Sequence, residues 1–324
     1  MPSSRRVTVI SHGPNCLDGL TCAVVAARHF SGREFHPIFA SNRQIDDSLR
    51  RYSPSHPERE ELWVTDISWR DDETTNHLNS LVDRGLELNW VDHHKSALDA
   101  RNNGKLAAKF TDYVLDMKYA ASRLLYERLC AKNDAAGEPN PDLLSLHNLV
   151  MTADDNDRWI LAIEGSRELA LTVRAMEQRD AYNALLEMNS DLSYGPELRR
   201  AYDRVQRELL ATMRLAESTC TEREVADRGL RVVTAECDGY SGEVADRWRD
   251  RYKQTVFALY DRRGGGISFR RTPDCKVDLS RLAGSFGGGG HEAASGCELP
   301  VSGPDRAASL ADKTVDALKR EVDL

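Results

Sequence analysis

The sequence has little that would serve a secreted or membrane-embedded protein. Its seven cysteines are odd in number and scattered, and none forms a Cys-x-x-Cys pair. This distribution argues against a disulfide framework and against a zinc knuckle. The first residues lack the apolar segment of a signal peptide, and no hydrophobic run approaches the roughly 20 residues that span a bilayer. We therefore expect a cytoplasmic protein with no membrane partner.

An excess of basic residues is also missing. Lys and Arg number 44 and Asp and Glu number 52, so the net charge is -8. Proteins that coat long duplex nucleic acid need a basic face that displaces counterions, and we expect no such partner here. A small anionic substrate in a local pocket is compatible with this charge, because bound divalent cations would offset the surrounding acids.

The length of 324 residues predicts two domains, since one hydrophobic core rarely serves so long a chain. Short apolar runs alternate with helical patterns in the first part, which is typical of a parallel sheet with helical crossovers. Strands are expected at residues 7–11, 34–40, 61–66 and 86–92, with helices at 20–29, 43–52 and 70–84. The middle of the chain is mostly helical, with helices expected at 119–132, 141–153 and 179–186.

A long charged helix at about 196–218 reads as a connector between domains, or alternatively as a solvated helix of the first domain. Beyond it the alternation restarts, with paired strands expected across the turn after Asp261. The elements expected there are strands at 229–235, 255–260 and 264–271 and helices at 242–252, 278–284 and 305–321. We predict a first domain at 1–195, a helical connector at 196–220 and a smaller α/β domain at 221–324.

Three predicted strands end in groups that bind metals or carry protons. These groups are His12 and Asp18, then Asp66, then the triplet Asp92-His93-His94. Because the carboxyl ends of parallel strands meet at one edge of a sheet, we expect the groups to converge there. For the two adjacent histidines, a surface turn without a role is the alternative interpretation.

The order of these groups resembles the DHH phosphoesterase superfamily, and specifically proteins with an N-terminal DHH domain and a C-terminal DHHA1 domain. The features that carry the resemblance are His12-x-x-x-Cys16-x-Asp18, Asp66, Asp92-His93-His94, Asp155 and the glycine run that ends at His291. The resemblance implies an α/β fold in which a parallel sheet flanked by helices forms the DHH domain. It also implies a smaller α/β DHHA1 domain, with the active site in the cleft between the domains.

The resemblance further implies a site for two metal ions. The implied ligands are His12, Cys16 and Asp66 for one ion, and Asp18, Asp66, His93 and Asp155 for the other. Asp154 and Asp157 are alternatives to Asp155, because spacing alone does not eliminate them. Carboxylate and imidazole ligands suit Mn²⁺, with Mg²⁺ or Fe²⁺ as other options. Two such ions can lower the pKa of a bridging water and stabilise phosphoryl oxygens.

Within the triplet, Asp92 is expected to orient His93 by accepting its free N–H, and His94 is left to face the substrate. Cys16 departs from the commoner family pattern, which has aspartate there. A branch described as oligoribonuclease-like or cyclic-nucleotide phosphodiesterase-like carries cysteine at this position. The alternative is that Cys16 is a buried structural cysteine. As a ligand, its thiolate would make the first metal site softer and favour a different metal ion.

The second domain is expected to bind the substrate. Gly288, Gly289 and Gly290 leave room for a phosphate to approach backbone amides, and His291 follows them. A merely flexible loop is the alternative for this run. In the family pattern an arginine in a Ser-x-Arg segment lies nearby, and Ser268-Phe269-Arg270 matches it. Arg270 would bind a phosphate with two hydrogen bonds.

These features predict a hydrolase that cleaves short linear oligoribonucleotides or dinucleotides to mononucleotides with two Mn²⁺ ions. Within the same chemistry, the alternatives are a phosphatase acting on 3′-phosphoadenosine 5′-phosphate, a cyclic-nucleotide phosphodiesterase and an exopolyphosphatase. A non-catalytic nucleotide-binding module is a further alternative, suggested by the cysteine at position 16. The oligomeric state is left open, with a homodimer as one option.

Overall fold

The chain divides into two compact units in a computed structural model that describes residues 5–14, 16–188, 190–225, 228–299 and 305–320. Unit 1 comprises residues 1–205 and unit 2 comprises residues 206–324. The division falls within the long helix α10 (Pro196–Thr219). The sequence-based boundaries at 195 and 220 flank this same helix.

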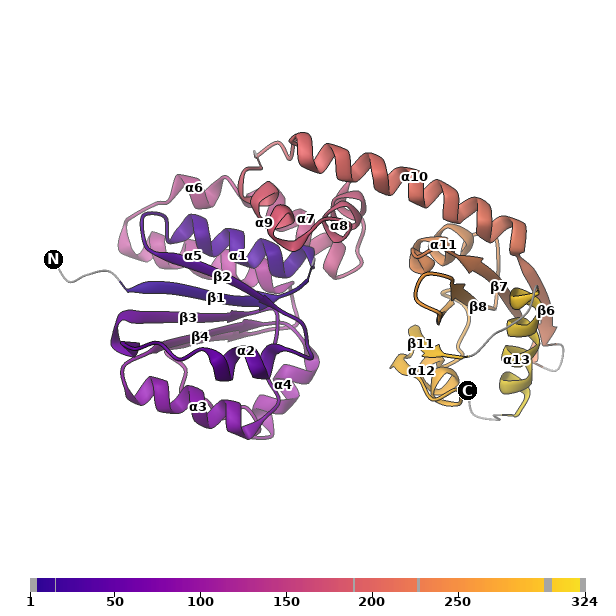
Figure 1. Cartoon of the computed structure of the whole chain (residues 1–324), viewed down its shortest axis with the longest axis horizontal. Coiled ribbons are helices and arrows are strands. Elements are labelled where there is room, and N and C mark those ends of the chain that lie inside the picture. Colours follow the sequence, from indigo (N-terminus) through magenta and orange to yellow (C-terminus); the bar gives the residue numbers. More distant parts are fainter. Residues whose placement is uncertain (1–4, 15, 189, 226–227, 300–304, 321–324) are drawn as a thin grey trace. The chain divides into compact units, whose positions relative to one another are not determined.

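Unit 1 is built on a parallel five-stranded sheet in the order β2-β1-β3-β4-β5 (Figure 1). Its strands are β1 (Arg6–His12), β2 (Phe35–Ala40), β3 (Glu60–Thr65), β4 (Glu87–Asp92) and β5 (Asp112–Leu115). Every residue of β3 is buried, as expected for a central strand with helices on both faces. The predicted parallel sheet is therefore confirmed.

Helices cover both faces of this sheet, as Figure 1 shows. On one face lie α1 (Leu17–His29), α5 (Ala121–Ala136), α6 (Pro141–Leu144), α7 (His147–Asp157), α8 (Ser166–Arg174) and α9 (Gln178–Leu186). On the other lie α2 (Ile45–Arg51), α3 (Asp72–Asp83) and α4 (Lys95–Asn102). A short 3₁₀ turn at Pro57–Arg59 leads into β3. The single helix expected at 141–153 is wrong, because α6 and α7 are separate.

Unit 2 is a six-stranded mixed sheet in the order β10-β11-β9-β8-β7-β6. Its strands are β6 (Thr221–Val225), β7 (Leu230–Cys237), β8 (Thr255–Asp261), β9 (Gly266–Arg271), β10 (Gly289–His291) and β11 (Ala294–Glu298). Its helices are α11 (Ser241–Trp248), α12 (Leu279–Gly284) and α13 (Arg306–Arg320). The expected pairing across the turn after Asp261 is confirmed, since β8 and β9 are antiparallel neighbours.

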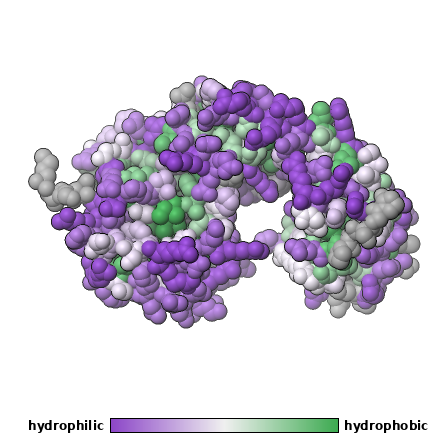
Figure 2. Space-filling model, in the orientation of Figure 1, coloured by the Kyte–Doolittle hydropathy of each residue, from purple (hydrophilic) through white to green (hydrophobic). Residues whose placement is uncertain are grey.

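The outer surface is in keeping with the polar composition. Figure 2 shows hydrophilic side chains over most of the visible face of each unit. None of the helices in the described part of the chain is long and apolar enough to cross a membrane.

One glycine sets how closely α1 packs against β1. A Cβ atom at Gly19 would overlap the backbone carbonyl oxygen of His12, at the end of β1. The hydroxyl of Ser11 donates a 2.6 Å hydrogen bond to the carbonyl oxygen of Gly19, which ties the same two elements together. Since His12 ends the strand and Asp18 lies in the first turn of α1, this close approach brings the two predicted ligands together.

Gly19→Ala is expected to destabilise unit 1 by roughly 1–3 kcal/mol, because the added methyl group forces helix and strand apart. Denaturant unfolding followed by circular dichroism measures this change. The matched control is Gly195→Ala, because a Cβ at Gly195 has no neighbouring atom within 4 Å. A Gly19→Ala protein as stable as the Gly195→Ala protein would contradict the close packing of α1 on β1.

Candidate metal centre

Three adjacent strands of unit 1 deliver the predicted site residues to one edge of the sheet. His12 is the last residue of β1, Asp66 follows the last residue of β3, and Asp92 is the last residue of β4. These strands are neighbours in the order β1-β3-β4, and all run in the same direction. The carboxyl edge of the sheet therefore gathers groups that are about 80 residues apart in sequence.

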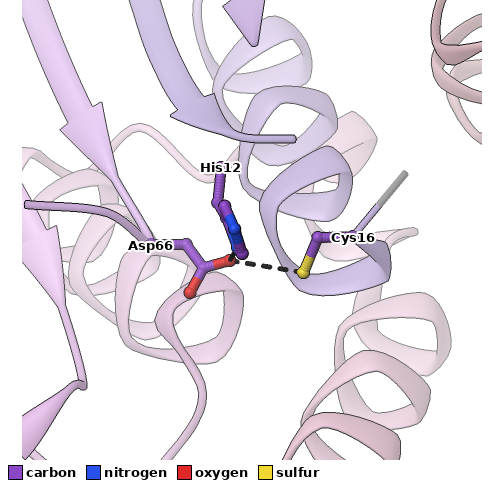
Figure 3. A group of neighbouring side chains, drawn as sticks. All are labelled: His12, Cys16 and Asp66. Carbon is purple, nitrogen blue, oxygen red and sulfur yellow. Dashed lines mark hydrogen bonds and ion pairs between the residues drawn. The ribbon is translucent and has the colours of Figure 1, made fainter. Parts of the chain in front are cut away.

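Asp66 lies at the centre of this group. Its Oδ2 is 3.4 Å from Nδ1 of His12 and 3.5 Å from Sγ of Cys16 (Figure 3). Its Oδ1 is 3.3 Å from Nε2 of His93. The backbone of Asp66 has a φ of 58°, in the left-handed region that aspartate tolerates better than most residues. The chain thus turns sharply at the end of β3, where this carboxylate meets groups from three other segments.

Asp18 enters the site from the first turn of α1 and is almost completely buried. Its oxygens accept hydrogen bonds from the backbone amides of Ala121 and Ser122, at 2.9 and 3.1 Å, and from the Ser122 hydroxyl. Both amides belong to the first turn of α5, whose positive end favours a carboxylate. Asp18 is therefore fixed in place by two helix N-termini, its own and that of α5.

The acids of α7 have separate surroundings. Asp157, at the end of the helix, has its Oδ2 3.4 Å from Nε2 of His93. Asp155 is turned to the following loop, where Oδ1 accepts from the amide of Ala162 at 2.9 Å and Oδ2 from the Ser166 hydroxyl at 2.6 Å. Among these two, it is Asp157 that lies beside the predicted ligands, whereas Asp155 organises the loop after α7.

Asp154, the other alternative, is also engaged elsewhere. Its Oδ1 accepts from the backbone amide of Ala120 at 2.7 Å, just ahead of α5, and its Oδ2 lies 3.0 Å from the guanidinium of Arg123. Spacing in the sequence did not decide which of these three acids is the metal ligand. The environment of each carboxylate in the structure separates them.

The contacts of Asp92 differ from the expected ones. Its Oδ1 accepts from Nδ1 of His94 at 2.7 Å and from the backbone amides of His93 and His94 at 2.7 and 3.1 Å. Ser68 donates its hydroxyl to Oδ2. Asp92 thus orients the ring of His94, not that of His93. With Nδ1 of His94 held by Asp92, Nε2 is the nitrogen of that ring left for a substrate.

The groups at this edge fit divalent cations. In the described part of the chain, three sets of ligand atoms lie within 4.8 Å of one another: His12-Cys16-Asp66, Asp66-His93-His94 and Asp18-His93-Asp157. Asp66 Oδ1 and His93 Nε2 are buried and make no hydrogen bond with the described residues. Buried polar atoms normally have partners, so two orphaned ligand atoms side by side indicate a place for a cation. Asp66 and His93 each occur in two of the three sets, as bridging ligands would.

The electrostatics of the edge support the same interpretation. Burial, reinforced by the charge of Asp66, raises the pKa of both Asp18 and Asp157. Burial opposes ionisation of Asp66 too, but His12 and His93 hold its pKa well below the usual range. Burial would lower the pKa of His93, yet Asp66 and the neighbouring acids raise it to about 9. Three carboxylates are therefore crowded together, with imidazoles and helix N-termini to balance them.

Cys16 lies in this negative field as the residue that precedes α1. Burial, followed by the charges of Asp66 and Asp18, raises the pKa of its thiol well above the usual value. The residue is therefore a thiol in the absence of a cation. A bound cation would favour the thiolate, which is the form that coordinates metals.

The predicted substrate-binding residues lie in unit 2. The glycine run, expected as a loop, instead enters β10, the edge strand that pairs with β11. The register aligns Arg270 of β9 with Ala294 of β11, and Ala294 with His291 of β10. Directly paired residues point to the same face of a sheet, so Arg270 and His291 share a face with a small alanine between them. Phe269 points the other way and is fully buried.

The contacts of the glycines explain why side chains are absent from this edge. A Cβ at Gly288 would overlap the backbone of Gly296 and the side chain of Cys297, and Gly290 has a φ of 143°. Gly289 has no neighbouring atom within 4 Å of a Cβ position and is exposed. Close strand packing thus requires glycine at 288 and 290, whereas Gly289 leaves backbone open to solvent.

Comparisons with known proteins give consistent relatives. The oligoribonuclease NrnB of Bacillus subtilis (strain 168) is 25% identical over 88% of this chain and 71% of its own length. The pGpG-specific phosphodiesterase PggH from Vibrio cholerae has a similar structure, with a TM-score of 0.60 and 13% identity over 97% of this chain and 99% of that one. The exonuclease RecJ bound to manganese gives a TM-score of 0.55 and 16% identity over 98% and 93%. No protein-family model matches the chain.

The separate surroundings of Asp155 and Asp157 lead to opposite expectations for their alanine variants. Asp155→Ala should lower the free energy of unfolding by roughly 3 kcal/mol, because buried amide and hydroxyl donors lose a charged partner. Asp157→Ala should leave the stability of the metal-free protein unchanged or higher, because the raised pKa of Asp157 shows that its charge is disfavoured in the fold.

Denaturant unfolding in a chelator measures the stability of both variants. Equilibrium dialysis against Mn²⁺ followed by elemental analysis measures their metal content, which should fall in Asp157→Ala. If instead Asp155→Ala lost metal and kept its stability, the assignment of the two acids would be reversed.

Proposed function

Since the chain belongs to the DHH/DHHA1 superfamily of phosphoesterases, we propose that it is a metal-dependent phosphodiesterase acting on short oligoribonucleotides or dinucleotides. The observation that carries this proposal is the convergence of three ligand sets on Asp66 and His93 at one edge of the sheet. The similarity to NrnB and to PggH, whose names describe enzymes for short oligonucleotides, supports the substrate class.

The ligands in this proposal differ from the sequence-based set at one position. His12, Cys16 and Asp66 would hold one cation, and Asp18, Asp66, His93 and Asp157 the other, with Asp157 in place of Asp155. Bound cations would activate a water molecule and neutralise charge on the phosphoryl oxygens. Mn²⁺ suits a set rich in carboxylate and imidazole, and RecJ has been crystallised with it. Mg²⁺ and Fe²⁺ are the other options.

The remaining residues have roles that follow from their contacts. Asp92 holds Nδ1 of His94, so that Nε2 can donate a proton to a phosphate oxygen or to the leaving group. The hydrogen bond to Asp92 raises the pKa of His94, which favours the protonated form needed for that donation. In unit 2, Arg270, the open backbone at Gly289 and His291 are proposed to bind a phosphate of the substrate.

The proposal predicts Mn²⁺-dependent release of mononucleotides from dinucleotides and short RNA by the purified protein, with no release in a chelator. Asp66→Ala should abolish turnover, because it removes the one carboxylate that contacts His12, Cys16 and His93. Chromatographic separation of substrates and products measures both effects.

A panel of other substrates separates the alternatives in the same assay. Preferential turnover of 3′-phosphoadenosine 5′-phosphate, of cyclic nucleotides or of polyphosphate would each replace the proposed substrate. A non-catalytic module would bind nucleotides without turnover and hold at most one metal per chain.

His94→Ala is expected to keep its metal and to lose roughly 10²–10⁴-fold in kcat, the usual effect of removing a general acid. Steady-state kinetics and elemental analysis on the same preparation measure the two properties. His36→Ala is the matched control, because His36 lies on the edge strand β2 and pairs only with Glu34 among the described residues. Loss of metal from His94→Ala would make His94 a ligand, and full activity would remove it from the mechanism.

A further inference from the structure

A pocket adjoins the metal centre within unit 1. Its volume is about 460 Å³, in the range of small-molecule sites, and Asp92 and His94 form part of its wall. The rest of the wall comes from Asn42, from the segment after β3, and from α4 with the turn that follows it. Nδ1 of His94 is 4.0 Å from Asp66 Oδ1, so the pocket and the ligand sets share one histidine.

Two cations of this pocket have no partner for their charge among the residues that the structure describes. Arg70 and Lys105 both line it and are exposed, and neither side chain forms a hydrogen bond or ion pair with the residues that the structure describes. Asp92 is the only acid among the described residues of the wall, and its oxygens are already engaged by Ser68, His94 and backbone amides. The pocket therefore offers uncompensated positive charge in a chain whose net charge is -8.

The backbone that carries these cations is nevertheless fixed. The amide of Arg70 donates to both oxygens of Asp46 at 3.2 Å, which anchors the segment to α2. The amide of Lys105 donates to the carbonyl of Ala100 at 2.9 Å, and Arg101 holds the next carbonyl, that of Leu106. Because the backbone is already anchored, only the two side chains have to be ordered when an anion binds.

The inner wall of the pocket is apolar. Ile67, Ala97 and Leu106 line it and are buried in one of the two cores of unit 1. Neutral hydrogen-bonding groups, Asn42 and Ser96, complete the wall beside the cations. An apolar wall with polar and cationic groups matches a ligand that has both a nucleoside and a phosphate.

We propose that this pocket binds the terminal nucleotide of a short oligonucleotide, with Arg70 and Lys105 contacting its terminal phosphate. The assignment rests on the phosphodiesterase function proposed above and names its preferred substrate as one that ends in a phosphomonoester. A phosphomonoester carries close to two negative charges at neutral pH, against one for an internal phosphodiester, so two free cations select for it. His94, shared by both sites, then faces the linkage next to the bound nucleotide.

The test compares the dinucleotides pApA, ApAp and ApA as substrates of the full-length, Mn²⁺-loaded protein. Arg70→Ala and Lys105→Ala should each raise KM for a phosphorylated dinucleotide by roughly tenfold, the effect of losing one charge-assisted hydrogen bond. The increase in KM for ApA, which has no terminal phosphate, should be smaller in both variants. Whether pApA or ApAp is affected identifies the end of the chain that is recognised.

Two further variants control for folding and for net charge. Arg70→Lys keeps the charge and should recover part of the loss. Arg84→Ala removes an exposed cation beside the start of β4, at the opposite edge of the sheet, and should not change the ratio between phosphorylated and unphosphorylated substrates. Equal changes in KM for pApA, ApAp and ApA in Arg70→Ala and Lys105→Ala would overturn the proposal.

A binding experiment separates failure of this proposal from failure of the function. Calorimetric titration with adenosine 5′-monophosphate and with adenosine, with and without a chelator, reports on the pocket without turnover. Tighter binding of the monophosphate that persists in chelator and is lost in Arg70→Ala supports the pocket, even if no dinucleotide is cleaved. Cleavage of dinucleotides by a protein in which Arg70→Ala leaves monophosphate binding unchanged keeps the function and overturns the pocket.

Discussion

Crowding of buried carboxylates around Asp66 is the constraint on which the rest of unit 1 depends. Asp18, Asp66 and Asp157 come from three different elements and face imidazoles, not lysine or arginine. Without a cation, burial and the charge of Asp66 raise the pKa of Asp18 and of Asp157, so the fold disfavours ionisation of both acids. A bound cation would reverse this, because it favours every ionised ligand at once. Metal binding at this edge would thus be coupled to folding.

Helix N-termini supply the compensation that the chain itself provides. Asp18 lies in the first turn of α1 and accepts from amides in the first turn of α5. Asp92 accepts from the amides of His93 and His94, immediately before α4. Three helices therefore begin at the carboxyl edge of the sheet, where their positive ends offset buried charge. Because a helix follows each of these strands, the fold itself reduces the electrostatic cost of burying acids at this edge.

The fold was predictable where burial on both faces leaves a continuous apolar run. β1, β3 and β4 were located to within a few residues for this reason. β2 was located equally well, although only Ala40 in it is buried. In contrast, α4 and β5 were missed, because α4 buries only Ala97 and β5 has no fully buried residue. The break between α6 and α7 was missed since apolar spacing continues across it, with Leu143 and Leu146 both buried.

The site was predictable only as far as topology reaches. Convergence of His12, Asp66 and His93 follows from parallel strands, because their carboxyl ends share an edge. The choice among the acids of α7 does not follow from topology, since it depends on which way each side chain leaves the end of a helix. Asp155 and Asp157 are two residues apart, so they point to nearly opposite sides of the helix, and only one of them can face the ligands. The spacing of Asp155 and Asp157 in the sequence indicates that only one of them faces the predicted ligands, but it does not tell which one.

The roles of Asp92 show how local geometry can link two sites. A single oxygen of this carboxylate accepts from two backbone amides and from Nδ1 of His94, so the main chain and the ring are fixed as one body. The same histidine forms part of the wall of the pocket that contains Arg70 and Lys105. A nucleotide that occupies this pocket is therefore placed against a ring whose free nitrogen is already oriented. The hydrogen bond between Asp92 and His94 fixes both the wall of the pocket and the proposed proton donor. Recognition of the terminal nucleotide and cleavage of the adjacent linkage would therefore depend on this one contact.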